Sequence, residues 1–145
     1  MTYSSNQDIV DAVGQDTVRR LTDDDGSGII GTDVLQGTRE DARQIIDAYV
    51  RGRYELPFGE TPALLRQIET ALVVERLYRR RPSADTPESV SDAAEEAMSQ
   101  LRMISTGTIT LGVDGDGDGD DDGADSYRSS RSSDKPTLRD LLSDY

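Results

Sequence analysis

An acidic, glycine-rich stretch at residues 23–34 carries the most specific chemical signal in the sequence. Its first eight residues fit the start of a Ca²⁺-binding EF-hand loop. Asp23, Asp25 and Ser27 supply oxygen ligands at the first, third and fifth positions, a glycine stands at the sixth, and an apolar residue stands at the eighth. The carbonyl group of Ile29, at the seventh position, would add a backbone ligand. This pattern predicts a site for Ca²⁺ or Mg²⁺.

The end of this loop departs from the EF-hand pattern. Val34 stands at the twelfth position in place of the bidentate glutamate, and Asp33 is the nearby carboxylate that could replace it. A loop without the bidentate ligand should bind Ca²⁺ weakly. A metal-free turn that fixes the angle between two helices is the alternative interpretation, and the missing glutamate favours it. If the loop does bind Ca²⁺, the protein would be an EF-hand-like regulatory or interaction module, and this is the alternative function.

The sequence contains one basic cluster, formed by Arg79, Arg80 and Arg81. Contact with DNA in a channel, or with acidic residues of a partner, is one interpretation of this cluster. The other, which we favour, is that cations at the C-terminus of a helix interact with the helix dipole. Three phosphate contacts would give only slight and strongly salt-dependent DNA affinity.

The last residues of the sequence, 135–145, carry a short helical pattern. Leu138, Leu141, Leu142 and Tyr145 stand at positions i, i+3, i+4 and i+7, which places them on one face of a helix. A helix this short is not stable alone in water. The pattern therefore predicts a docking segment for a partner, and the alternative is that it folds back on the core of its own chain.

The composition argues against most kinds of enzyme. The chain has no histidine and no cysteine, so it lacks the commonest general base, the commonest transition-metal ligand and any thiolate site. No phosphate-binding glycine loop and no nucleophile–base constellation can be identified. We expect a protein that is not an enzyme.

The charge balance is strongly acidic. There are 29 acidic and 16 basic residues, the net charge is −13, and Lys135 is the only lysine. Such a surface repels nucleic acid. An excess of carboxylates with almost no lysine is typical of proteins adapted to molar salt, where a Debye length of about 3 Å screens the repulsion. The sequence shows no secretory signal and no apolar run long enough to cross a membrane, so we expect a soluble protein without membrane contact.

Apolar periodicity predicts an all-α bundle of about four helices within residues 1–113. The expected helices cover residues 6–13, from 33 to about 52, from about 62 to about 79, and from about 86 to 104, with a single helical turn at 16–21.

Residues 106–113 alternate β-branched and polar residues, which predicts one short strand whose partner would come from a neighbouring subunit or from another protein. Residues 114–134 begin with a run of Asp and Gly and are expected to form an acidic, flexible linker. Residues 135–145 complete an extended C-terminal arm that contains the docking segment. The sequence thus divides into a helical domain at 1–113, a linker and a docking segment.

The order of these segments resembles a known family. The residues that carry the resemblance are the start TYSSNQDIVDAVG, the EF-hand-like stretch from Leu21 to Leu35, and above all IDAYVRGRYELP at residues 46–57. The chain resembles the neck proteins of Mu-like tailed phages over residues 1–113 and the last few residues. It departs from that family in its Asp-rich insert at 114–125 and in its near-absence of lysine.

The resemblance implies a function and a set of partners. It implies a structural head–tail connector, a ring of about twelve subunits beneath the portal that joins the capsid to the tail and lets viral DNA pass without specific binding. The expected partners are other copies of the chain, the portal protein and a downstream neck or tail protein. The C-terminal motif would dock on the portal. The expected location is the virion neck, after assembly in the host cytoplasm, and the salt-adapted composition suggests a haloarchaeal host.

Overall fold

The computed structural model describes residues 1–113, which fold into five α-helices. These are α1 (Asn6–Val13), α2 (Gln15–Thr22), α3 (Thr32–Val50), α4 (Ala63–Arg79) and α5 (Glu88–Thr106). The predicted all-α class is confirmed. The bundle has five helices rather than about four, because residues 15–22 form a full helix and not a single turn.

The difference at α2 has a tertiary cause. An eight-residue helix gains little stability from its own hydrogen bonds. Val18 and Leu21 of α2 are nevertheless almost completely buried against the bundle. Burial of these two side chains stabilises a helix that the local sequence pattern signals only weakly.

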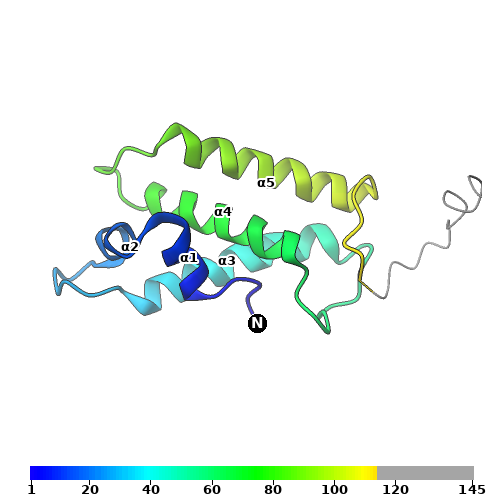
Figure 1. Ribbon diagram of the computed structural model, residues 1–145, viewed down its shortest axis with the longest axis horizontal. Coiled ribbons are helices and arrows are strands. Elements are labelled where there is room, and N and C mark those ends of the chain that lie inside the picture. The colour runs from blue at the N-terminus through cyan, green and yellow to red at the C-terminus, as the bar shows by residue number, and fades with distance from the viewer. Residues whose placement is uncertain (114–145) are drawn as a thin grey trace, which may run out of the picture.

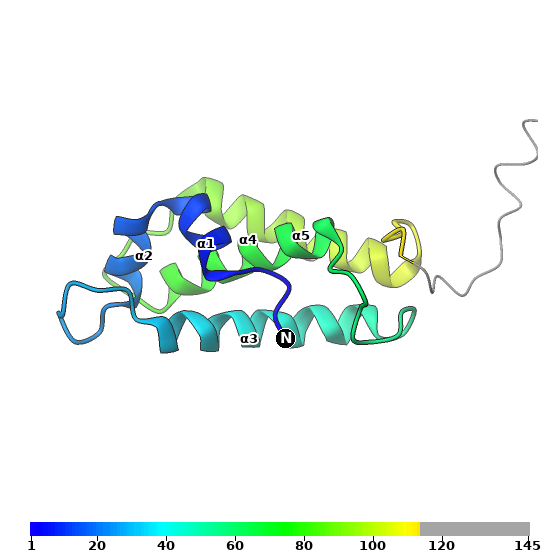
Figure 2. The ribbon, with the colours of Figure 1, turned by 60° about the horizontal axis from the view of Figure 1, so that its bottom comes forward.

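The three long helices run up, down and up along the bundle (Figures 1 and 2). α4 lies at the centre and contacts every other helix, whereas α1 and α2 pack at the end where α3 begins and α4 finishes. Short connections between antiparallel neighbours are typical of such bundles.

The first helix begins at a capping box formed by Ser5 and Asp8. The Ser5 hydroxyl accepts a hydrogen bond from the Asp8 amide at 3.1 Å, and the Asp8 carboxylate accepts one from the Ser5 amide at 2.7 Å. Both amides would otherwise lack a partner within the helix. Gly14 then separates α1 from α2 in a conformation with φ of 87°.

The core consists of aliphatic side chains contributed by all five helices. Those without any exposed surface are Ile9, Val18, Leu35, Ala42, Ile46, Val50, Leu65, Val73, Leu77, Leu101 and Ile104. The apolar faces predicted for α3, α4 and α5 point inward as expected.

The strand predicted at residues 106–113 is wrong, since residues 1–113 contain no strand. α5 continues to Thr106, and Gly107 ends it in the left-handed conformation with φ of 82°. The period-two alternation nevertheless has a physical meaning. Ile109, Leu111 and Val113 pack against the core while the residues between them are exposed, so the alternating side chains dock on the bundle instead of pairing with a second strand.

The turn between α3 and α4 holds this C-terminal stretch of the bundle in place. Tyr54 is 4% exposed, and its hydroxyl accepts a hydrogen bond from the Leu111 amide at 3.1 Å. The Phe58 ring lies 5.9 Å from the Tyr54 ring and 6.0 Å from the Tyr3 ring, measured between centroids. The three aromatic side chains thereby join the N-terminus, this turn and the end of α5.

Candidate functional site

The loop between α2 and α3 is ordered by the carboxylate of Asp23. One oxygen of this carboxylate accepts hydrogen bonds from the Ser27 amide at 2.9 Å and the Ser27 hydroxyl at 3.2 Å, and the other accepts one from the Gly28 amide at 2.8 Å. The bond from the Gly28 amide is the main reason that the pKa of Asp23 is lowered. The side chain therefore closes the loop on itself.

Two arginines of the basic cluster clamp the same loop. Arg80 and Arg81 each contact the Asp24 carboxylate at 2.8 Å, and they lower its pKa, Arg80 most of all. Arg80 also donates to the carbonyl oxygen of Leu21 at 3.0 Å, and Arg81 donates to that of Asp23 at 2.6 Å. The C-terminal end of α4 is thus tied to the acidic loop.

Arg79 differs from its two neighbours. It pairs with Glu75 one turn earlier on α4, and its side chain is 77% exposed. Contact of the three arginines with DNA or a partner stays a prediction. In this fold Arg80 and Arg81 are engaged within the chain, so Arg79 has the cation best placed to meet another molecule.

In this conformation the loop uses part of the predicted metal site for its own hydrogen bonds. Both oxygens of Asp23 accept hydrogen bonds from the loop, and Asp24 is paired with arginine. Asp25 and Ile29 are exposed, and Asp33 lies in the first turn of α3. Within residues 1–113 no three acidic side chains converge to hold a metal ion. Ca²⁺ or Mg²⁺ binding stays a prediction, and the hydrogen bonds favour the metal-free turn.

A second polar cluster, absent from the sequence predictions, fastens the N-terminal residues to the bundle. Ser4 donates both its amide and its hydroxyl to one oxygen of Glu69 on α4, the hydroxyl at 2.5 Å. Glu69 is completely buried. Burial raises the pKa of Glu69 and outweighs the hydrogen bonds from Ser4, which lower it.

Tyr3 extends this cluster to α3. Its hydroxyl donates to Asp47 at 2.5 Å, and Arg43 contacts the other oxygen of Asp47 at 2.5 Å. Burial, followed by the bond to Asp47, raises the pKa of Tyr3. Arg39 of α3 in turn donates to the carbonyl oxygen of Ser4 and to the Asn6 side chain. Residues 2–6 are therefore held by α3 and α4 together.

A hydroxyl that donates to a carboxylate can act as a nucleophile, with the carboxylate as its base. The pair of Ser4 and Glu69, however, is not accessible to a substrate. Ser4 is 4% exposed and Glu69 is not exposed at all. A catalytic pair must lie where a substrate can meet it. We therefore interpret the cluster as a structural fastening.

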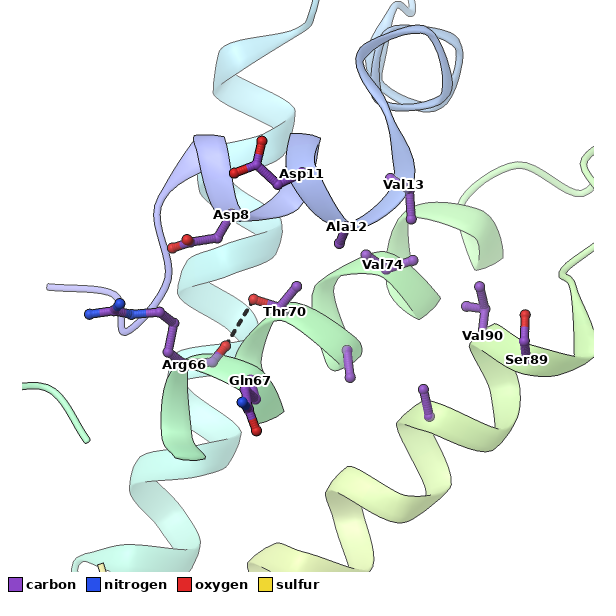
Figure 3. A pocket seen from close by; sticks show the side chains of 12 residues that line it. Asp8, Asp11, Ala12, Val13, Arg66, Gln67, Thr70, Val74, Ser89 and Val90 are labelled. Atoms are coloured by element: carbon purple, nitrogen blue, oxygen red, sulfur yellow. Dashed lines mark hydrogen bonds between the residues drawn. The ribbon is translucent and has the colours of Figure 1, made fainter. Parts of the chain in front are cut away.

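An apolar groove of about 510 Å³ lies over α4, between α1 and α5 (Figure 3). The apolar side chains that line it are Ala12, Val13, Ala71, Val74, Val90 and Ala93. Asp8 and Asp11 stand along its α1 edge, and Arg66 stands at one end. Apolar surface with a charged edge is typical of a binding groove for a peptide or a protein.

The predicted docking residues Leu138, Leu141, Leu142 and Tyr145 lie outside the described residues, as does the acidic linker at 114–134. Of the helices in residues 1–113, none has the combination of length and apolarity that crossing a membrane requires.

These observations define the class as a small all-helical bundle in which ionic and polar contacts fasten the loop and the N-terminus. Comparison with known families identifies the protein family. The model of the family described as Bacteriophage Mu, Gp36 matches residues 3–128, and the chain belongs to this phage protein family. The match covers the whole bundle apart from its first two residues. No curated protein matches the chain.

Proposed function

We propose that this protein is a structural head–tail connector of a tailed virus. The observation that carries the proposal is membership of the Mu Gp36 family over residues 3–128, which suggests a structural or morphogenesis protein of a phage. The helical bundle supports the proposal, because its two polar clusters, around Asp24 and Glu69, make contacts within the chain that stabilise it. The apolar groove and the amphipathic pattern at 138–145 add two surfaces suited to protein contacts.

In this proposal about twelve copies form a ring beneath the portal, since a heterologous interface with a closing rotation gives cyclic symmetry. The ring joins the capsid to a downstream neck or tail protein, so the protein belongs to the virion neck. The net charge of −13 would repel the phosphates of DNA passing through the channel. The same acidic, lysine-poor composition suggests a haloarchaeal host.

Electron microscopy of the full chain with the portal protein of its own virus, in molar salt, tests this proposal. We expect rings bound to one end of the portal. A matched pair of variants tests the docking segment: Leu142→Asp should weaken portal binding, whereas Ser143→Asp, one residue further on, should leave it unchanged. The proposal fails if neither rings nor portal complexes form at any salt concentration.

A further inference from the structure

The groove over α4 exposes apolar surface that residues 1–113 leave open. Its floor is Val74 of α4, 5% exposed, and its walls are small side chains such as Ala12 of α1 and Ala93 of α5, both exposed. Figure 3 shows Ala12, Val13, Val74 and Val90 pointing into the space between the two flanking helices. Walls of small side chains leave room for the larger side chains of a ligand.

The sequence beyond residue 113 contains a segment that suits this groove. A helix over residues 136–145 would place Leu138, Leu141, Leu142 and Tyr145 along one face. These i, i+3, i+4 and i+7 anchors are the pattern by which an amphipathic helix binds an apolar groove. We propose that, in the free subunit, residues 136–145 occupy the groove between α1 and α5 of their own chain.

The length of the intervening chain matches the span that it must cover. The described chain ends beside the end of the bundle where α5 finishes (Figure 1), whereas the groove-lining residues of α5, Ser89, Val90 and Ala93, lie near its start. These residues precede Thr106, the last residue of α5, by 13–17 positions, so the groove lies about 20–26 Å from that end along the helix. Residues 114–137 begin with alternating Gly and Asp, and a chain of this length has a root-mean-square reach of roughly 25–30 Å.

This match favours the chain's own groove over that of a second copy. A tethered segment whose reach equals the span has an effective concentration of roughly millimolar. Free subunits at micromolar concentration cannot compete with that value, because a ten-residue helix binds weakly by itself. The contact therefore forms within one chain until a partner with higher affinity takes the segment away.

The charges agree with this arrangement. In a helix over residues 136–145, Arg139 lies on one side of the apolar face and Asp140 lies away from it, and Lys135 immediately precedes the helix. The groove edge formed by α1 carries Asp8 and Asp11. The basic side of the segment can thus face the acidic edge of the groove, which selects one orientation of the helix.

The inference goes beyond the proposed connector function and does not depend on it. Docking in the chain's own groove covers two apolar surfaces at once, the groove and the anchor residues. Free subunits are thereby kept from associating through either surface. An assembly partner that binds the segment would open the groove at the same moment.

Cysteine cross-linking in the full chain tests the inference, since the natural sequence has no cysteine. One variant carries Ser89→Cys, at the groove, with Ser143→Cys in the segment. The matched control carries Ser99→Cys with Ser143→Cys, and Ser99 is exposed on α5 outside the groove and nearer to Val113. A short bismaleimide should link the first pair several-fold faster than the control, with the product a single chain.

Adding Leu142→Asp to both pairs should abolish the difference, because it places a charge on the apolar face of the segment. Equal rates for the two parent pairs would show only the proximity given by the tether, and would overturn the inference. A product made mainly of linked dimers would also overturn it, because the segment would then occupy another copy. Neither result bears on whether rings form on the portal.

Discussion

Glu69 is a charged residue at a fully buried position of the central helix. It stands one residue after Ile68 and three before Leu72, both of which belong to the apolar core. Ionised groups are seldom fully buried unless they are paired, and here the partners are the amide and hydroxyl of Ser4. A glutamate within the apolar face of α4 was the available sequence signal for this fastening, but its partner lies 65 residues away and could not be inferred from spacing.

Glu69 should give the protein a distinctive pH dependence. Because burial raises its pKa above the ordinary value of 4.5, the folded state holds this proton to higher pH than the unfolded chain. The contribution to the free energy of unfolding is complete below about pH 4.5 and is lost as the pH rises through the raised pKa. Denaturant titrations of the parent and of Glu69→Gln should differ by an amount that changes with pH in this window.

Glu60→Gln is the matched control, since Glu60 is exposed. This variant should follow the parent at every pH. If the difference between parent and Glu69→Gln were constant across the window, the carboxyl would titrate alike in both states and the account of Glu69 would be wrong.

Asp24 and Asp25 are neighbours with different roles, and this gives a second prediction. Asp24 forms ion pairs with Arg80 and Arg81, whereas Asp25 is exposed and forms no ion pair within residues 1–113. Asp24→Asn should release the clamp, so the loop amides of Ser27 and Gly28 should exchange hydrogen faster. Asp25→Asn should leave their exchange rates unchanged, and equal effects of the two substitutions would contradict the clamp.

At the scale of elements, sequence patterns predicted most of the helices whose positions depend on local interactions. The helix at 6–13 and the inward faces of α3, α4 and α5 follow from a period of 3.6 residues. Two elements were misjudged because tertiary contacts decide them. Burial of Val18 and Leu21 completes α2, and contact of Leu111 with the bundle replaces the predicted strand pairing.

Two glycines near the start of α3 should respond oppositely to alanine. A side-chain carbon on Gly31 would overlap the carbonyl oxygen of Thr22, whereas one on Gly37, within α3, would meet no atom. Gly31→Ala should therefore destabilise the protein by about 1–3 kcal/mol. Gly37→Ala should stabilise it by roughly 0.5–1 kcal/mol, because alanine favours the helix.

Urea denaturation of the two variants measures both free energies. A neutral effect of Gly31→Ala would show that the end of α2 and the start of α3 do not approach as closely as the structure has them. The hydrogen bond from the Gly31 amide to the Thr22 hydroxyl, 3.0 Å long, is part of the same contact.

At the scale of the whole molecule, the EF-hand-like loop could be located from its residue types, but its contacts with distant residues could not. The sequence correctly placed a loop between two helices, but oxygens of this loop accept hydrogen bonds from its own amides and from Arg80 and Arg81, which follow α4. Arg80 is 56 residues from Asp24, so the sequence offered no reason to pair them. The acidic loop and the basic cluster were each identified as a candidate site, but their mutual contact was not foreseen.

The net charge of −13 predicts a dependence of folding on salt. At low ionic strength the carboxylates repel one another over roughly 30 Å, whereas molar salt shortens this range to about 3 Å. Dialysis of the full chain from molar to millimolar salt should therefore reduce its helical circular dichroism. Unchanged helical signal in low salt would contradict adaptation to high salt and, with it, the suggestion of a haloarchaeal host.

The connector function is tested most directly in the virus that encodes this chain. A nonsense mutation in its gene should leave capsid and tail assembly intact but prevent their joining, because no ring would link them. Electron microscopy of the lysate should then show DNA-filled heads and separate tails, and the wild-type gene supplied in trans should restore joined particles. Complete, infectious tailed particles in the absence of the protein would contradict the proposed function.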